Sequence, residues 1–113
     1  MEKVTARGII EYLQKAVEEK KQLGKDVWLD AALKLTVLSL DESDILIDME
    51  KILGQKKVEM WEVQTGKKNI AEINMKIEAT DIYAQVKKQK IFLGVIEEMI
   101  RVAKLSARLN EFV

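Results

Sequence analysis

The second half of the chain contains an unusually long stretch with no strong helix breaker. From Asn69 to Glu111 there are 43 residues without a proline, and Gly94 is the single glycine among them. Apolar residues return at helical spacing, which predicts one unbroken helix over 69–111. The apolar positions include Ile70, Ile73, Ile77, Ile96, Ile100 and Ala103. Such a helix would be about 64 Å long, whereas a domain of this size has a radius of gyration of only about 13 Å. It must therefore lie along an equally long neighbour, break, or find a partner chain.

Local signals support a helix start at Asn69. A turn-like run precedes it, and an asparagine in this position can cap the first backbone amides. Glu72 follows three residues later, as in a capping box. The i,i+4 pairs Glu72/Lys76 and Glu97/Arg101 have the order that supports a helix.

Composition places the chain among helical-bundle or coiled-coil proteins. The 113 residues predict one domain, 1–113, and 48% of them are hydrophobic and 34% charged, which excludes a disordered chain. There is no cysteine and no histidine, so thiol chemistry, the commonest general base and the commonest metal ligands are absent. We therefore expect no enzymatic activity, no cofactor and no metal. No apolar run is long enough to span a membrane and no secretion signal is present, so we expect a cytoplasmic protein.

The first half predicts further helices. Residues 5–23 form a first helix with Thr5 as the cap and Gly24 as the stop. Residues 26–40 are apolar almost all round, which is typical of a helix buried on all sides. A strand over 35–40 is the alternative, because several of its residues favour strands. Asp41 could begin a new helix over 42–64, so that 26–64 forms either one helix or two.

Together these elements predict an all-α fold. If 26–64 is nearly continuous, its 39 residues span about 58 Å and match the second long helix in length. Two arms of equal length joined by a short turn make a long antiparallel helical hairpin. The short first helix would pack on the open end, and the whole would assemble into an oligomeric helical bundle.

The apolar surface is widest near the end of the chain. Two apolar stripes run side by side from residue 91 onward, which is more than one partner helix normally covers. This width predicts a homo-oligomer formed through residues 91–109 and the 26–40 region. The predicted interface residues are Phe92, Leu93, Val95, Ile96, Met99, Ile100, Val102 and Ala103. Gly94 lies among them, either to allow another backbone to approach closely or simply as a tolerated glycine.

Charge is unevenly distributed although its sum is zero. Residues 1–65 carry 10 basic and 13 acidic side chains, a net −3, and residues 66–113 carry 9 and 6, a net +3. Such a chain can pair acidic and basic regions between arms or between subunits. The acidic group Asp41, Glu42, Asp44 and Asp48 could hold a divalent cation, but acids at a helix start more often complement the helix dipole.

A basic group supports an alternative hypothesis of nucleic-acid contact. Tyr83 and Phe92 flank part of this group, and aromatic side chains near lysines can stack bases. A solvated helix face explains the same pattern, and it is the interpretation we favour. The lysines concerned are Lys56, Lys57, Lys67, Lys68, Lys87, Lys88 and Lys90.

The second half resembles small phage proteins. The resemblance rests on the run Thr65-Gly-Lys-Lys-Asn-Ile-Ala-Glu-Ile, on Tyr83 with the lysines after it, and on the apolar-basic end from Ile96 to Lys104. It is similar to the Lys/Glu-rich helical-hairpin accessory proteins encoded in early or recombination regions of tailed phages. The resemblance implies an accessory factor that works by protein or DNA contact in the host cytoplasm, and it assigns no site residues.

These observations predict a non-enzymatic oligomerisation or adaptor protein that acts by protein–protein contact. Its expected partners are copies of itself, with another protein as a further candidate, and no membrane association is expected. One alternative is a nucleic-acid-binding replication or recombination factor, which predicts salt-dependent binding. A second alternative is an inhibitor of a host defence or replication enzyme, with the acidic 41–50 region facing a basic partner. A virion or scaffold component is a third.

Overall fold

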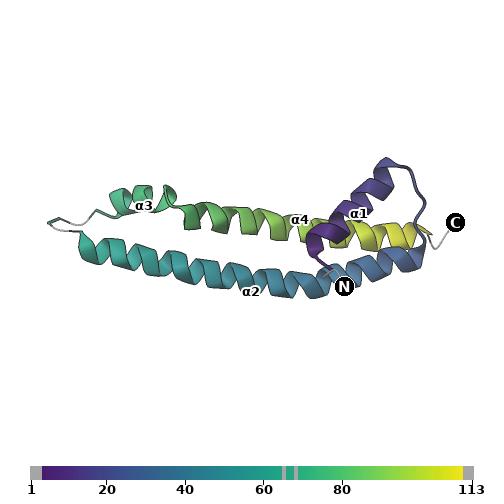
Figure 1. Ribbon diagram of the computed structural model, residues 1–113, viewed down its shortest axis with the longest axis horizontal. Coiled ribbons are helices and arrows are strands. Elements are labelled where there is room, and N and C mark those ends of the chain that lie inside the picture. The colour runs from purple at the N-terminus through teal and green to yellow at the C-terminus, as the bar shows by residue number, and fades with distance from the viewer. Residues whose placement is uncertain (1–3, 65, 68, 111–113) are drawn as a thin grey trace. The chain divides into compact units, whose positions relative to one another are not determined.

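Helices make up almost all of the regular structure. The computed structural model describes residues 4–64, 66–67 and 69–110, and these ranges hold four helices and no strand. In chain order they are α1 (Ala6–Glu18), α2 (Lys25–Val63), α3 (Ile70–Glu78) and α4 (Asp81–Asn110) (Figure 1). The predicted all-α class is therefore confirmed. Glu111, the expected end of the last helix, lies outside the described residues.

Helix α1 begins as predicted and ends earlier than predicted. The hydroxyl of Thr5 accepts a hydrogen bond from the amide of Gly8 at 3.0 Å, which is the expected N-cap. The helix ends at Glu18, because Lys20 adopts a left-handed conformation with φ of 56°. The amide of Lys21 then donates to the carbonyl of Ala16 at 2.9 Å, which closes the helix in a Schellman-type turn. Gly24 was expected to stop this helix, but it instead lies directly before α2.

Helix α2 runs without interruption from Lys25 to Val63. The strand alternative for 35–40 and the helix boundary at Asp41 are therefore wrong, and 26–63 is one helix. The hydroxyl of Thr36 donates to the carbonyl of Ala32 at 2.8 Å, and that of Ser39 donates to the carbonyl of Thr36 at 2.6 Å. Their polar groups are thus satisfied inside the helix, so these residues need not end it.

The long helix expected over 69–111 is broken in two, which corrects the prediction. Residues Ala79 and Thr80 separate α3 from α4. The hydroxyl of Thr80 donates to the carbonyl of Ile77 at 2.6 Å and accepts from the amide of Tyr83 at 3.4 Å. Thr80 therefore occupies the N-cap position of α4, with Asp81 in the first turn. One short side chain both ends α3 and starts the next helix.

The chain divides into two compact units, and the single domain expected over 1–113 stays a prediction. Unit 1 consists of Met1–Glu42 and Leu93–Val113, and unit 2 consists of Ser43–Phe92. Helices α2 and α4 therefore each contribute one part to unit 1 and another part to unit 2. None of the described helices carries an apolar stretch of the length and hydropathy that crossing a membrane requires.

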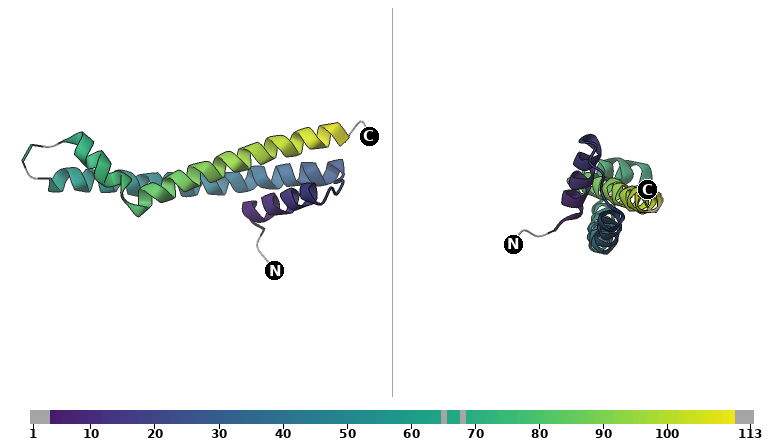
Figure 2. Two further views of the ribbon diagram at one scale, coloured as in Figure 1. Left: turned by 90° about the horizontal axis from the view of Figure 1, so that it is seen from above. Right: turned by 90° about the vertical axis from the view of Figure 1, so that its right-hand side faces the viewer.

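Unit 1 has a core of small side chains around a few large ones. Leu13 of α1, Leu35 of α2 and Ile96 of α4 have no exposed surface at all. Most of the remaining buried side chains of unit 1 are alanines, and such small residues let helix backbones approach one another closely. The other buried side chains in unit 1 are Ala6, Ile10, Ala16, Trp28, Ala31, Ala32, Ala103 and Ala107. Figure 2 shows α1 beside the parts of α2 and α4 that complete this unit.

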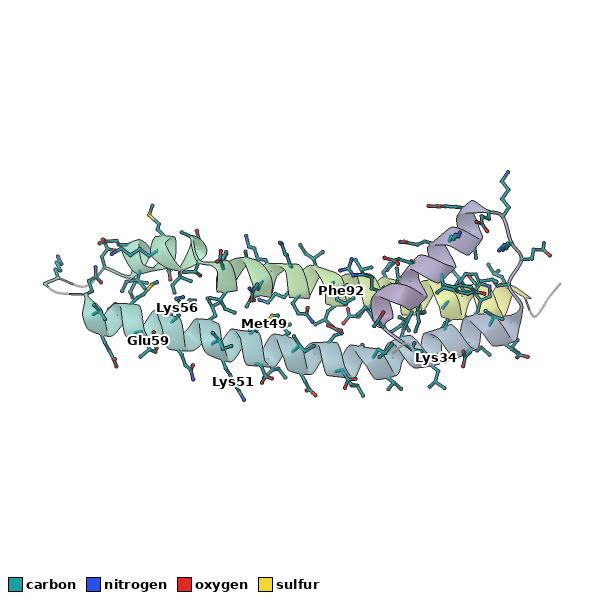
Figure 3. The ribbon with its side chains drawn as sticks, in the orientation of Figure 1. Lys34, Met49, Lys51, Lys56, Glu59 and Phe92 are labelled. Atoms are coloured by element: carbon teal, nitrogen blue, oxygen red, sulfur yellow. The ribbon has the colours of Figure 1, made fainter. Side chains whose placement is uncertain are left out.

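Unit 2 combines the second part of α2 with α3 and the first part of α4. Its buried side chains include Ile73 and Ile77 of α3 and Val86 of α4. Met49 and Phe92 lie between α2 and α4 in this unit (Figure 3). At the start of α3, the side chain of Asn69 accepts from the amides of Ala71 (3.0 Å) and Glu72 (3.4 Å), so the predicted cap is confirmed.

The side chain of Gln64 completes that cap. The Gln64 amide group donates to the Glu72 carboxylate at 3.3 Å, and its carbonyl oxygen accepts from the backbone amide of Asn69 at 3.4 Å. In a capping box the glutamate itself would accept from that amide. Here Gln64 hydrogen-bonds to both the Glu72 carboxylate and the Asn69 amide, and so links them indirectly. Glu72 also keeps the predicted ion pair with Lys76, at 3.5 Å.

Candidate interaction surfaces

Helix α2 carries a second apolar stripe on its outward side in unit 1. Leu29, Leu33, Val37 and Leu40, here called the α2 stripe, follow one another at spacings of three or four residues and so share one helix face. Their exposed fractions lie between 43% and 65%. The buried residues of the same segment, such as Trp28 and Leu35, occupy the other side. The expectation that 26–40 is buried all round is therefore wrong.

The predicted interface on α4 is divided between the inside and the outside of the fold. Ile96 and Ala103 are fully buried within unit 1, where the chain's own helices cover them. Phe92 belongs to unit 2, and Val95 is 40% exposed. The remaining residues of the predicted set are half-buried: Leu93, Met99, Ile100 and Val102. Two of the eight predicted interface residues thus belong to the core of unit 1, and the other six remain partly accessible.

Accessible apolar residues form a regular stripe along α4. Val95, Val102, Leu105 and Leu109, here called the α4 stripe, fall on the alternating three- and four-residue spacing of coiled-coil contacts. Val102 is half-buried, and the other three are between 40% and 61% exposed. Leu105 was missed by the sequence prediction. The signal that could have found it is its heptad relation to the predicted interface residues.

A charged pair interrupts the α4 stripe. Glu98 occupies the stripe position between Val95 and Val102, and the Arg101 side chain donates hydrogen bonds to its carboxylate, one of them at 3.2 Å from Nε. The sequence predicted an i,i+4 ion pair between Glu97 and Arg101 instead. These hydrogen bonds, together with the positive charge of Arg101, hold the pKa of Glu98 below its ordinary value. The same contacts raise the pKa of Arg101. Arg101 thus provides an ion-pair partner for Glu98, the polar residue within an otherwise apolar stripe.

Gly94 shows no close approach within the chain. A Cβ atom built at this position would meet nothing within 4 Å. The same is true of Gly54 in α2. Any close contact at Gly94 would therefore have to come from another molecule.

The described lysines among those proposed for nucleic-acid contact lie on α2, on the segment before α3 and on α4, all in unit 2. In unit 2, the ammonium of Lys90 lies 3.5 Å from the Glu50 carboxylate, and that of Lys87 lies 5.0 Å from the Tyr83 ring centre. Lys56 and Lys57 line two different surface depressions. Lys67 and Lys88 are exposed, and Lys68 lies outside the described residues.

The acidic group of α2 is spread along one helix. Asp41, Asp44 and Asp48 are exposed, and Glu42 is half-buried. Within the described ranges, no group of three or more acidic side chains is close enough together to hold a metal ion. These acids therefore form a charged part of the surface of α2, next to its apolar residues.

Open surface depressions occur in both units. In unit 1, a depression of about 470 Å³ lies between α1 and α2, with Val4, Ile9 and Tyr12 on one side and Val27 on the other. In unit 2, one of about 380 Å³ is lined by Met60, Val63 and Ile73 among others. Sites for small molecules usually combine an apolar enclosure with a few convergent polar groups. These depressions are open, and the apolar stripes are the more extensive feature.

Comparisons with known proteins give no relative. No family model, no curated protein and no solved structure matches this chain. Function must therefore be inferred from the chain's own surfaces.

Proposed function

We propose that this chain is a non-enzymatic protein that associates with copies of itself and acts by protein–protein contact. The observation that carries the proposal is that two helices of unit 1 each have an apolar stripe outside the core. These are the α2 stripe and the α4 stripe defined above. Both stem from regions that the sequence predicted as interfaces, 26–40 and 91–109.

The exposed apolar residues of the two stripes are arranged in order along a helix face. Single exposed apolar residues are normal on any protein and need no explanation. A stripe at helical spacing is different, because it presents apolar side chains in the geometry that a neighbouring helix fills. The α4 stripe keeps this spacing although Glu98 occupies one of its positions. Burying a fully exposed leucine contributes roughly 1.5–3 kcal/mol, and the stripe residues, which are already partly buried within the chain, each contribute a fraction of that. Covering both stripes therefore gives a sizeable driving force for association.

The biological role that fits such a module is that of an accessory or adaptor factor. The long antiparallel helical hairpin and the oligomeric bundle expected from the sequence are part of this proposal. The resemblance of the second half to phage accessory proteins favours the same kind of role.

The first test is the solution mass of the protein, measured by light scattering over a wide range of concentrations. We expect an oligomer that dissociates on dilution. Replacing Val95 and Leu105 by glutamine should shift the equilibrium to monomer, because both are partly exposed and the substitutions remove apolar contact area without disturbing the core. A matched control is Val17→Gln on α1, since Val17 is 63% exposed and lies outside both stripes.

The same measurement separates the alternatives. A protein that stays monomeric at every concentration contradicts the proposal. A complex that forms with a single-stranded oligonucleotide at low salt and disappears at high salt would favour the nucleic-acid alternative instead. We expect no such complex.

A further inference from the structure

The two stripes of unit 1 differ in the charges that border them. In the part of α2 that belongs to unit 1, residues 25–42, there are four acids, Asp26, Asp30, Asp41 and Glu42, against Lys25 and Lys34, a net charge of −2. Lys34 is itself paired with Asp30 at 2.8 Å. Asp26, Asp30 and Asp41 are exposed, so the α2 stripe has an acidic border.

The α4 stripe has the opposite border. Between residues 95 and 109 there are three bases, Arg101, Lys104 and Arg108, against the two acids Glu97 and Glu98. All five are exposed. Because Glu98 is paired with Arg101, Lys104 and Arg108 stand against Glu97 alone, which leaves the border with a net charge of +1. The two stripes are therefore similar in apolar character and opposite in charge.

From this difference we infer that the α2 stripe of one copy packs on the α4 stripe of another copy. This inference rests on the self-association proposed above and names the contact that produces it. Pairing two α2 stripes would bring acid against acid, and pairing two α4 stripes would bring base against base. Pairing α2 with α4 brings acids to bases. Like charges placed together at an interface exclude a partner, whereas complementary charges select it.

The apolar side chains and the charges have different tasks in this contact. Leucine and valine side chains leave water and supply the affinity. Exposed ion pairs add little affinity, but they decide which of three possible pairings is the least repulsive. The contact joins two different surfaces of the chain. If a two-fold axis relates two copies, each copy covers both stripes of the other in a closed dimer, whereas any other arrangement leaves one free stripe on each copy until a ring closes.

The decisive experiment mixes two variants that each lack one stripe. The first variant carries Leu33→Gln and Leu40→Gln in α2, and the second carries Val95→Gln and Leu105→Gln in α4. All four positions are at least 40% exposed, so both variants should fold. Circular dichroism and thermal unfolding of each variant, measured at low concentration before mixing, check that both variants are folded. Val17→Gln again serves as the control.

If α2 packs on α4, each variant alone is monomeric and the mixture forms a one-to-one complex. The first variant keeps its α4 stripe and the second keeps its α2 stripe, so one contact remains possible between them. Light scattering would detect a particle of twice the chain's mass only in the mixture. The control should assemble as the unchanged protein does.

Other outcomes overturn the inference. If either variant alone assembles like the unchanged protein, the stripe it lacks takes no part in the contact. If both variants stay monomeric after mixing, the stripes do not meet each other. In these cases self-association itself stands, because the unchanged protein still forms an oligomer. A monomeric unchanged protein would instead overturn the proposed function.

Charge reversal tests the borders directly. Asp41→Lys should weaken assembly, and so should Arg108→Glu. Both changes in one chain should restore much of the lost assembly, because the reversed charges meet again across the contact. If the double variant is no better than the worse single one, the charges do not select the pairing.

Discussion

Leu33 and Leu35 lie two residues apart on α2 and face opposite environments. Leu35 has no exposed surface, whereas Leu33 is 64% exposed. The same residue type thus serves the core of unit 1 at one position and the outer stripe at the other. Substituting each leucine in turn can therefore distinguish the contribution of α2 to folding from its contribution to assembly.

Replacing these leucines by alanine should give different results. Leu35→Ala leaves a cavity in the core, so we expect it to lower the free energy of unfolding by roughly 2–5 kcal/mol. Leu33→Ala should change the stability of the monomer by less than about 0.5 kcal/mol. Urea denaturation at low protein concentration measures both values. Equal losses at the two positions would show that the outer stripe is covered within the chain itself.

Hydrophobic pattern alone could not have separated these two leucines. A segment that is apolar almost all round, such as 26–40, can be buried on every side or can have one face in a core and another exposed. Both arrangements have the same sequence pattern, and the choice between them depends on how many neighbours the tertiary fold provides. The sequence therefore predicted the helix correctly, but it did not predict that one face of the helix is exposed on the single chain.

Local interactions were predicted more successfully than long-range ones. The caps at Thr5 and Asn69 were expected, and both form, because a cap depends only on a side chain and amides a few residues away. Thr80, followed by Asp81, is a start signal of the same kind. It was overlooked because apolar periodicity continues across it. The division into two units depends on contacts between distant segments, and no local pattern reports it.

The glycines of the long helices offer a second prediction. Gly54 and Gly94 lie inside α2 and α4, and a Cβ atom at either would meet nothing within 4 Å. Alanine removes the extra freedom that glycine has in the unfolded chain, so Gly54→Ala and Gly94→Ala should each add about 0.5–1 kcal/mol to the free energy of unfolding.

Gly66 is the matched control for these substitutions. Its φ of +82° is a conformation that L side chains rarely adopt. Gly66→Ala should therefore lower the free energy of unfolding by roughly 1 kcal/mol, although the space around the residue is open. Thermal unfolding of the three variants should show two increases and one decrease in midpoint. A decrease for Gly94→Ala that is confined to high protein concentration would place Gly94 in a contact between copies.

The end of α1 gives a third prediction. Lys20 has a φ of 56°, a left-handed conformation that costs a non-glycine residue roughly 1–2 kcal/mol. Lys20→Gly relieves this cost but increases the freedom of the unfolded chain, so the net gain in stability should be about 0.5–1 kcal/mol. Glu18→Gly, at the last residue of α1, should instead destabilise the protein. Chemical denaturation compares the two, and a loss on Lys20→Gly would mean that the lysine side chain stabilises the turn.

The ion pair within the α4 stripe gives a prediction about pH. The hydrogen bonds and charge of Arg101 lower the pKa of Glu98 in the folded chain below its ordinary value. A lowered folded-state pKa contributes stability above the unfolded-state pKa, and this contribution is lost as pH falls through the folded value. In an NMR titration, Arg101→Gln should raise the pKa of Glu98 towards its ordinary value. Arg108→Gln, which leaves the pair intact, should not. If the two variants titrate alike, Arg101 is not the cause of the shift, and Glu98 would stand in the stripe without the partner that shields its charge.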